Sequence, residues 1–281
     1  MLKTRVATAL MLAPLVLAAM FLLSPMAWAI AMLVATMQIA WEWARLSNFT
    51  LPTLLVFVAG VALACLCLLY APVAGFARGW PTAVVASVCG VSAMFWIAVA
   101  PAWVIGRWTT RKSWAMVPAG WVVLIGAWLA LVELQARSPW LVLAAMAIVW
   151  IADTAAYFAG RAFGRRKLAP LVSPGKTWEG VYGGLVAVAV YALCLVPLAR
   201  DAHFTGEVGA LSVVLWLALA LLSAGISVLG DLFESLMKRH AGVKDSGRLL
   251  PGHGGVFDRT DALLAAMPLA ALAAQLFLTK T

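Results

Sequence analysis

Long apolar runs dominate the pattern of hydrophobic and polar positions along the chain. Each run is long enough to cross a hydrocarbon core of about 30 Å as a helix. Lipid offers the backbone no hydrogen-bond partners, and the alternation typical of barrel strands is absent, so the runs must be helical. The pattern therefore predicts an all-α polytopic membrane protein with about nine transmembrane helices. The runs lie near residues 6–23, 26–44, 51–72, 81–105, 115–135, 139–160, 180–199, 210–232 and 261–279.

The composition agrees with this pattern. Hydrophobic residues make up 65% of the 281 residues and charged residues only 11%, against about 25% charged in soluble domains. A separate soluble domain does not fit, so residues 1–281 are expected to form a single integral membrane domain. The four cysteines lie inside apolar runs without a C-x-x-C pair, which argues against zinc or redox chemistry.

The basic residues predict the orientation. If the amino terminus is cytoplasmic, 16 of the 20 Lys and Arg residues fall on the cytoplasmic side and four on the other. The net charge of +9 is spread over short loops, which favours membrane orientation over nucleic-acid binding. A cleaved signal peptide is the alternative, because Lys3 and Arg5 precede the first run and 27–29 resembles a cleavage site. The apolar stretch continues at once to residue 40, so we expect the first span to be retained.

The carboxylates are the sharper clue, because an ionised carboxylate at membrane depth is costly and usually functional. Asp231, Glu234, Ser235 and Lys238 follow i, i+3, i+4, i+7 spacing, so one helix face carries two carboxylates, a hydroxyl and an ammonium. The alternative is a set of ion pairs at the interface, in which these groups only hold the helices in register.

The segment 244–261 is unlike a plain connector. Its glycines at 252, 254 and 255 permit positive φ and close backbone approach, so backbone amides could cradle a phosphate. A tight re-entrant turn is the alternative. Asp258 and Asp261 are three residues apart near the start of the last run, where carboxylates could hold a hard cation through their oxygens.

The segment after the sixth run adds Asp153, four basic residues in 161–167, and Lys176. Gly175-Lys176-Thr177 resembles the end of a P-loop, but Pro170 stands where that motif requires glycine. Lys176 could still meet a phosphate as a point charge. The basic residues in 165–167 are expected to contact lipid headgroups. Two charged cytoplasmic loops thus offer carboxylates, cations and an anion site, a set that suits phosphoryl or nucleotidyl transfer.

These residues resemble the phosphatidate cytidylyltransferase family. The family signature, S-x-x-K-R, four residues, K-D, then P-G-H-G-G-x-x-D-R-x-D, matches from Ser235 to Asp261. Two upstream segments match at 153–160 and 173–180. The resemblance covers roughly residues 141–281, the expected catalytic region, with the signature at 235–261. Residues 1–140 carry an apolar pattern without an evident catalytic motif.

The resemblance implies a magnesium-dependent transfer of a cytidylyl group from CTP to phosphatidic acid, giving CDP-diacylglycerol and pyrophosphate with one or two Mg²⁺ ions. The lipid phosphate is already a nucleophile near neutral pH, since a phosphate monoester has a second pKa of about 6. The implied partners are CTP, phosphatidic acid and membrane lipids, with a homodimer left open and no nucleic acid. The implied location is a bacterial inner membrane, with the site facing the cytoplasm.

The candidate residues fall into three groups. The expected catalytic residues are Asp231, Lys238, Lys244, His253, Asp258 and Arg259. The expected substrate-binding residues are Asp153, Tyr157, Ser173, Lys176, Thr177, Ser235, Arg239, Gly252, Gly254 and Gly255. The expected metal ligands are Asp231, Asp258, Asp261 and Asp245.

Two other functions remain as alternatives. A CTP-dependent polyprenol or phytol kinase also has acidic and glycine-rich loops, but the full signature disfavours it. A transporter would also place charges in membrane segments, but near the midplane and with broken helices.

Overall fold

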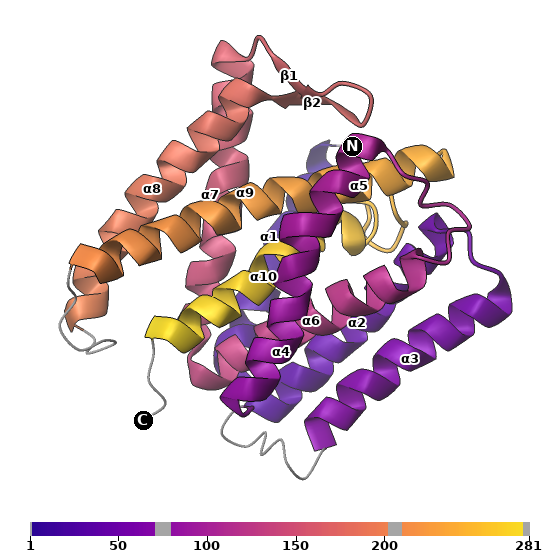
Figure 1. Ribbon diagram of the computed structural model, residues 1–281, viewed down its shortest axis with the longest axis horizontal. Helices are drawn as coiled ribbons and strands as arrows, with labels where there is room; N and C mark the ends of the chain where they lie inside the picture. Colours follow the sequence, from indigo (N-terminus) through magenta and orange to yellow (C-terminus); the bar gives the residue numbers. More distant parts are fainter. Residues whose placement is uncertain (1, 71–79, 202–209, 278–281) are drawn as a thin grey trace.

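The computed structural model describes the backbone of residues 2–70, 80–201 and 210–277, and the side chains of 10–70, 80–197 and 210–277. Within these ranges the protein is almost entirely helical (Figure 1). The helices are α1 (Leu2–Leu22), α2 (Pro25–Leu46), α3 (Leu51–Tyr70), α4 (Thr82–Met94), α5 (Ala100–Gly106), α6 (Met116–Arg137), α7 (Pro139–Phe163), α8 (Trp178–Asp201), α9 (Ala210–Ala241) and α10 (Phe257–Phe277).

Seven helical segments in the described residues are long and apolar enough to cross a membrane. They are α3, the continuous segment from α4 to α5, and each of α6 to α10. The chain is therefore an all-α, multi-pass membrane protein, as the sequence predicts. The count of nine spans stays a prediction, because α1 and α2 occupy the first two predicted runs but are not among the seven. The helix α2 contains the polar residues Gln38, Glu42 and Arg45 near its carboxyl end.

Two helices extend beyond their apolar runs, and both extensions matter for the site. The helix α9 continues past residue 232 to Ala241, and α10 begins at Phe257, four residues before its run. The extension of α9 follows from Phe233 and Met237, which are fully buried and continue its apolar face. Lys238 therefore lies on the predicted helix face with Asp231, and Asp258 lies in the first turn of the last helix, as the sequence predicts.

Local sequence explains several helix ends and one irregular turn. Ser24 and Ser138 each cap a helix by accepting a backbone N–H, and each precedes a proline at the first helical position. A π-helical turn, η2 (Phe95–Val99), joins α4 to α5. It lies directly before Pro101, whose ring would clash with the carbonyl of the preceding turn of a regular helix.

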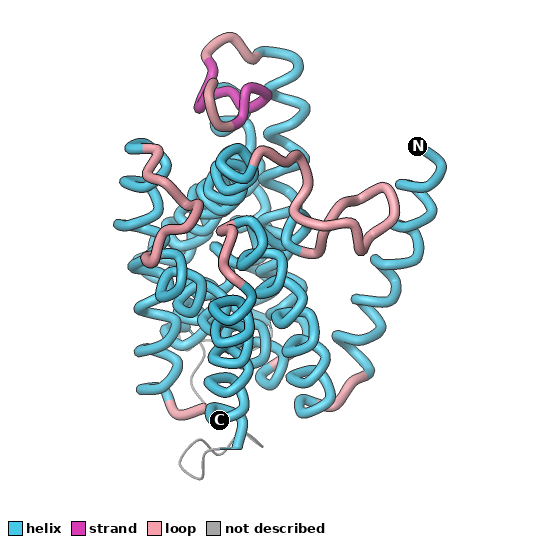
Figure 2. Tube along the Cα trace, turned by 90° about the vertical axis from the view of Figure 1, so that its right-hand side faces the viewer, coloured by secondary structure: helices cyan, strands magenta, loops and turns pink. Residues whose placement is uncertain are grey.

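The helices pack around α10, which contacts α9, α6, α4 and α7. The α7–α8 pair lies on one side of α9, and the group of α2, α3, α4 and α6 lies on the other (Figure 1). A short antiparallel hairpin, β1 (Lys167–Ala169) and β2 (Ser173–Thr177), connects α7 to α8. Figure 2 places this hairpin at one end of the molecule and the end of α10 at the other.

Candidate active site

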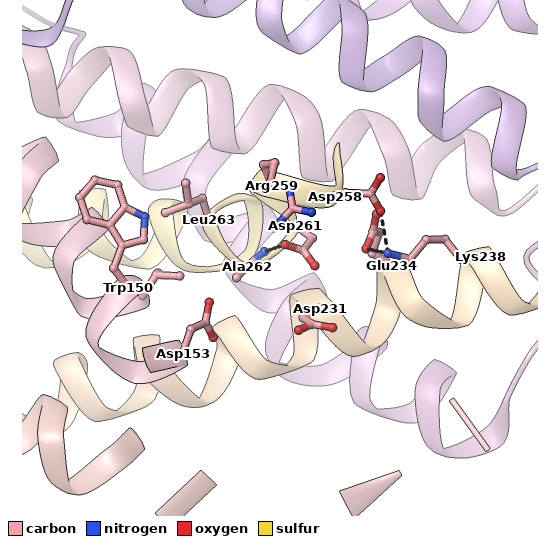
Figure 3. A pocket seen from close by; sticks show the side chains of 11 residues that line it. Trp150, Asp153, Asp231, Glu234, Lys238, Asp258, Arg259, Asp261, Ala262 and Leu263 are labelled. Carbon is pink, nitrogen blue, oxygen red and sulfur yellow. Dashed lines mark hydrogen bonds and ion pairs between the residues drawn. The ribbon is translucent and has the colours of Figure 1, made fainter. Parts of the chain in front are cut away.

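A cavity of about 280 Å³ lies between α7, α9 and α10. Five carboxylates and two cations line it, together with an apolar side formed by Val149, Trp150, Ala262 and Leu263 (Figure 3). The charged lining residues are Asp153, Asp231, Glu234, Lys238, Asp258, Arg259 and Asp261. The structure thus brings together charged residues from the sixth, eighth and ninth predicted runs.

A close approach of two helices places the aspartates of α9 and α10 around one space. A Cβ atom on Gly230 would overlap the backbone oxygen of Asp261, so only glycine allows α9 and α10 to approach this closely. Asp231 follows directly in α9. The carboxylates of Asp231, Asp261 and Asp153 surround the same space from three different helices (Figure 3).

Lys238 bridges α9 and α10. Its Nζ lies 2.5 Å from Glu234 Oε2 and 2.7 Å from Asp258 Oδ1. The side chain of Glu234 is only 1% exposed, and its Oε1 has no hydrogen-bond partner among the described residues. Burying a carboxylate oxygen without a partner is costly. Glu234 therefore brings one carboxylate oxygen without a partner to the wall of the cavity.

Asp258 orders the glycine-rich segment. Besides Lys238, it binds the backbone N–H of Ser246 at 2.7 Å and that of Gly255 at 2.8 Å, both through Oδ2. The hydroxyl of Ser246 lies 3.0 Å from the same oxygen. Both oxygens of Asp258 are therefore already occupied by groups of the protein.

The hairpin brings one cation against a carboxylate of the cavity lining. Lys176, on β2, lies 2.7 Å from Asp231 Oδ2, and Asp231 Oδ1 accepts a hydrogen bond from Ser235 at 3.2 Å. Arg239 joins the same two elements, because its Nε donates to the carbonyl of Val172. The two charged segments predicted from the sequence therefore meet in the structure.

The interface ion pairs weighed as an alternative do form, in a different arrangement. Glu234 and Lys238 pair along α9, and Lys238 also pairs with Asp258 across to α10. Asp231 pairs with Lys176 instead of Lys238. The Arg259 guanidinium binds the carbonyl of His253 at 2.6 and 2.8 Å, which holds this side chain in place at the cavity.

Several candidates lie outside the cavity lining. Lys244, Asp245 and Tyr157 are exposed, and Thr177 is buried beneath the hairpin, where its hydroxyl accepts the N–H of Gly180 at the start of α8. His253 lies outside the lining as well, and its ring Nδ1 has no partner among the described residues. The functional roles of these residues stay predictions.

The glycine-rich segment differs from the expected phosphate cradle. Gly252 and Gly254 do adopt positive φ, whereas Gly255 does not. The amides of residues 253 and 254 donate to the carbonyl of Leu250, and those of 255, 256 and 257 donate to carboxylates of the protein. Phosphate binding by this segment stays a prediction and would require these amides to exchange partners.

Sequence reasoning missed Glu42, on α2. Its carboxylate is 1% exposed and accepts hydrogen bonds from the backbone N–H groups of Val256 and Phe257 at the start of α10. The signal was present in the sequence. Glu42 is a lone carboxylate within the second apolar run, and such a group at membrane depth usually has a role.

Comparison with known proteins shows the family of the chain. The sequence model of a family described as the cytidylyltransferase family matches residues 3–277. The chain belongs to the cytidylyltransferase family. It is 40% identical to a phosphatidate cytidylyltransferase of Pseudomonas aeruginosa over 281 residues, covering 95% of each chain. It is 37% identical to a protein of the same name from Haemophilus influenzae, covering 95% of this chain and 96% of the relative. The resemblance predicted from the signature is confirmed, and it extends through the first 140 residues.

Proposed function

We propose that the chain transfers the cytidylyl group of CTP to phosphatidic acid in the cavity between α7, α9 and α10. The observation that carries the proposal is the cavity lining, because Lys238, Asp258, Arg259 and Asp261 of the signature line it together with Asp231. An oxygen of the lipid phosphate would attack the α-phosphorus of CTP. The bond to the β-phosphate would break, and pyrophosphate would leave.

The charge of the cavity supports a requirement for divalent metal. Five carboxylates face two cations in the lining, so a triphosphate and a lipid phosphate would be repelled unless further cations enter. When bound, Mg²⁺ neutralises phosphate charge and stabilises the leaving group. The described residues contain no ready group of three or more ligating side chains, so the substrate phosphates would complete the coordination.

Asp231 and Asp261 are the proposed metal ligands that the geometry supports best, with Asp153 beside them. Carboxylate oxygens are the donors that Mg²⁺ prefers, and the unpartnered oxygen of Glu234 lies at the same cavity. Both oxygens of Asp231 also have partners, but these are the side chains of Lys176 and Ser235, which can turn away from an entering cation. Asp258 fits less well than the sequence indicated, because two of its partners are the backbone N–H groups of Ser246 and Gly255. Asp245 is exposed and outside the lining, so it is the weakest candidate.

The remaining groups divide between the two substrates. Lys176, Lys238 and Arg259 are the cations placed to bind phosphate groups. The apolar side formed by Val149, Trp150 and Leu263 would accept the glycerol and the first part of the acyl chains. Because the lipid phosphate is already ionised near neutral pH, no strong general base is required.

A reconstituted assay tests this function. The purified chain in lipid vesicles would receive phosphatidic acid, Mg²⁺ and CTP labelled either at the α- or at the γ-phosphate. Label from the α-position in the lipid, with release of pyrophosphate, is the expected result. Label from the γ-position in the lipid would indicate a kinase, and no phosphatidic acid-dependent turnover would contradict both enzymes.

We further propose that the hairpin end of the molecule faces the cytoplasm of a bacterial inner membrane. The positive-inside distribution of Lys and Arg supports this orientation. Single cysteines introduced at Lys167 and at Pro139, in a background without the natural cysteines, test it. The first should react with an impermeant thiol reagent only after the inner membrane is opened. Whether the chain forms a homodimer is tested by cross-linking in native membranes.

A further inference from the structure

Glu42 accepts four hydrogen bonds, as many as Asp258, and three of them come from the glycine-rich segment and the start of α10. It accepts from Val256 N at 3.1 Å, Phe257 N at 2.9 Å and Ser246 Oγ at 2.7 Å, and from Gln38 on its own helix at 2.9 Å. Four donors suit an ionised carboxylate, which only accepts hydrogen bonds. Three of these donors lie more than 200 residues away in sequence, so Glu42 connects α2 to the opposite end of the chain.

The segment between α9 and α10 is shaped around this carboxylate. A Cβ atom on Gly247 would lie 2.7 Å from Glu42 Oε1, and one on Gly255 would overlap Glu42 Oε2. The two bound amides of α10 belong to a helix amino terminus, where the N–H groups have no partner within the helix and favour a negative charge. Glu42 thus fills the position that a bound anion occupies at other helix amino termini.

The contacts of Glu42 lead directly to the cavity. The hydroxyl of Ser246 lies between Glu42 Oε2 at 2.7 Å and Asp258 Oδ2 at 3.0 Å, and it can donate to either. Asp258 in turn holds Lys238, which lines the cavity. One hydroxyl therefore separates Glu42 from the ion pair at the cavity wall.

The residue after Glu42 reinforces the same connection. The ring of Trp43 is fully buried and lies 5.7 Å from the ring of Phe233 and 5.6 Å from that of Phe257. Phe233 and Phe257 immediately precede Glu234 and Asp258, the two partners of Lys238. Consecutive residues of α2 therefore fix both helix segments that carry this ion pair.

We propose that Glu42 is a positioning residue of the active site, which holds the first turn of α10 so that Asp258 and Lys238 keep their place at the cavity. The inference rests on the proposed function only in taking this cavity as the active site. Glu42 touches neither the cavity lining nor a substrate group, so its effect passes through Ser246 and Asp258. Misplacement of reacting groups by about 1 Å can cost about 100-fold in rate.

The variant Glu42→Gln tests the proposal, because it keeps the size and removes one acceptor and the charge. The expected kcat is about 100-fold lower, with the KM for CTP changed by less than about threefold. Hydrogen–deuterium exchange, measured without substrates, should be at least about tenfold faster in peptides covering residues 246–258. Glu42→Asp keeps the charge on a shorter side chain and should recover part of the kcat.

Two controls separate positioning from a general loss of stability. Gln38→Leu removes the donor to Glu42 from its own helix and leaves those of residues 246–257 in place, so kcat and exchange should stay within about threefold of the parent. Glu133→Gln alters an equally buried carboxylate, on α6, that contacts Gln275 near the far end of α10. Glu133→Gln should change neither the hydrogen–deuterium exchange at 246–258 nor the kcat of the folded protein.

Three results would overturn the inference: a Glu42→Gln protein with kcat within threefold of the parent, unchanged exchange at 246–258, or an equal loss of kcat in Glu133→Gln. If Glu42→Gln does not fold, Ser246→Ala takes its place, since it removes the hydroxyl that connects Glu42 to Asp258 and accepts the N–H of Asp258, while the backbone donors to Glu42 remain. About tenfold lower kcat is then expected, and a parent-like kcat would overturn the inference. A parent chain without cytidylyl transfer would instead contradict the proposed function, while the exchange test stands unaffected.

Discussion

The two ends of α10 each contain a buried polar cluster, and the clusters differ in how their charges are satisfied. At the far end, Glu133 accepts from Arg137 Nε at 2.8 Å, Trp80 N at 2.9 Å and Gln275 Nε2 at 3.4 Å, so both of its oxygens have partners. At the cavity end, five carboxylates face two cations, and an oxygen of Glu234 has no partner among the described residues.

This difference supports a structural role for the far cluster and the proposed functional role for the cavity cluster. Glu133 is complete without a ligand, because its partners come from α6, from α10 and from Trp80, two residues before α4. The cavity cluster has an excess of negative charge that further cations would offset, and buried charge without a partner is costly. Such an imbalance is expected where a protein keeps groups ready for a ligand.

The largest effect is expected from removing negative charge at the cavity. Asp231→Asn and Asp261→Asn should each lower kcat by about 10²–10³-fold and raise the required Mg²⁺ concentration, because each removes a charge that a hard cation needs. Kinetics at varied Mg²⁺, together with Mn²⁺ binding followed by electron paramagnetic resonance, measure both effects. Near-normal turnover with unchanged metal dependence in both variants would leave the ion-pair interpretation standing.

The contrast with Asp258 sharpens this test. Asp258→Asn should also lower kcat, but faster hydrogen–deuterium exchange at 246–258 should accompany the loss, since Asp258 holds Ser246 and Gly255. Asp231→Asn should leave that exchange unchanged. If the two variants behave alike in exchange, the division between metal ligand and loop anchor is wrong.

The next effect concerns the balanced cluster. Glu133→Gln should lower the free energy of unfolding by about 1–3 kcal/mol. Glutamine has one acceptor oxygen, so it cannot accept the hydrogen bonds of Arg137 and Trp80 on two separate oxygens as Glu133 does. Thermal unfolding in detergent measures the change, and the kcat of the folded fraction should match the parent. A selective loss of kcat without a change in unfolding temperature would show that the far cluster also serves the reaction.

Much of the architecture could be predicted from the sequence, because lipid leaves an apolar run of this length no alternative to a helix. The common face of Asp231, Glu234 and Lys238 also follows from helical spacing, and all three line the cavity. The apolar runs alone end before the helices do, because buried side chains such as Phe233 continue α9 past its first charges.

The contacts between distant segments could not be predicted. Lys176 contacts Asp231 and Glu42 contacts Phe257 because of how the helices pack. The spacing of residues along the sequence does not indicate either contact. Helix packing also explains why backbone amides of the loop bind carboxylates of the protein, which the sequence did not predict. Glycines at 252–255 indicate a tight backbone, but only the position of α2 shows that a carboxylate of the protein binds the amides at the start of α10.

A smaller effect on kinetics is expected from replacing Lys176, the hairpin cation that pairs with Asp231 of the cavity lining. Lys176→Met should raise the KM for CTP about tenfold, equivalent to ~1.4 kcal/mol, because it removes a positive charge beside Asp231. Lys167→Met is the matched control, since Lys167 is exposed on the other strand of the same hairpin. Equal effects of the two variants on KM would indicate a general contribution of hairpin charge rather than a specific contact.

The smallest effect is expected at Lys244. Its variant tests whether a residue of the sequence signature matters for activity when it does not line the cavity. Lys244 is a signature residue, yet its side chain is exposed and outside the cavity lining, whereas Arg259 of the same signature lines the cavity. Screening by water weakens an exposed charge, so Lys244→Gln should change kcat/KM by no more than about threefold. Arg259→Gln should change it by at least about tenfold, because Arg259 is the cation that α10 presents to the cavity. Steady-state kinetics of both variants at two salt concentrations decide the matter. A large, salt-independent loss of kcat/KM in Lys244→Gln would mean that the loop folds over the cavity when substrates bind. The charged residues that line the cavity in the substrate-free protein would then be only part of the site.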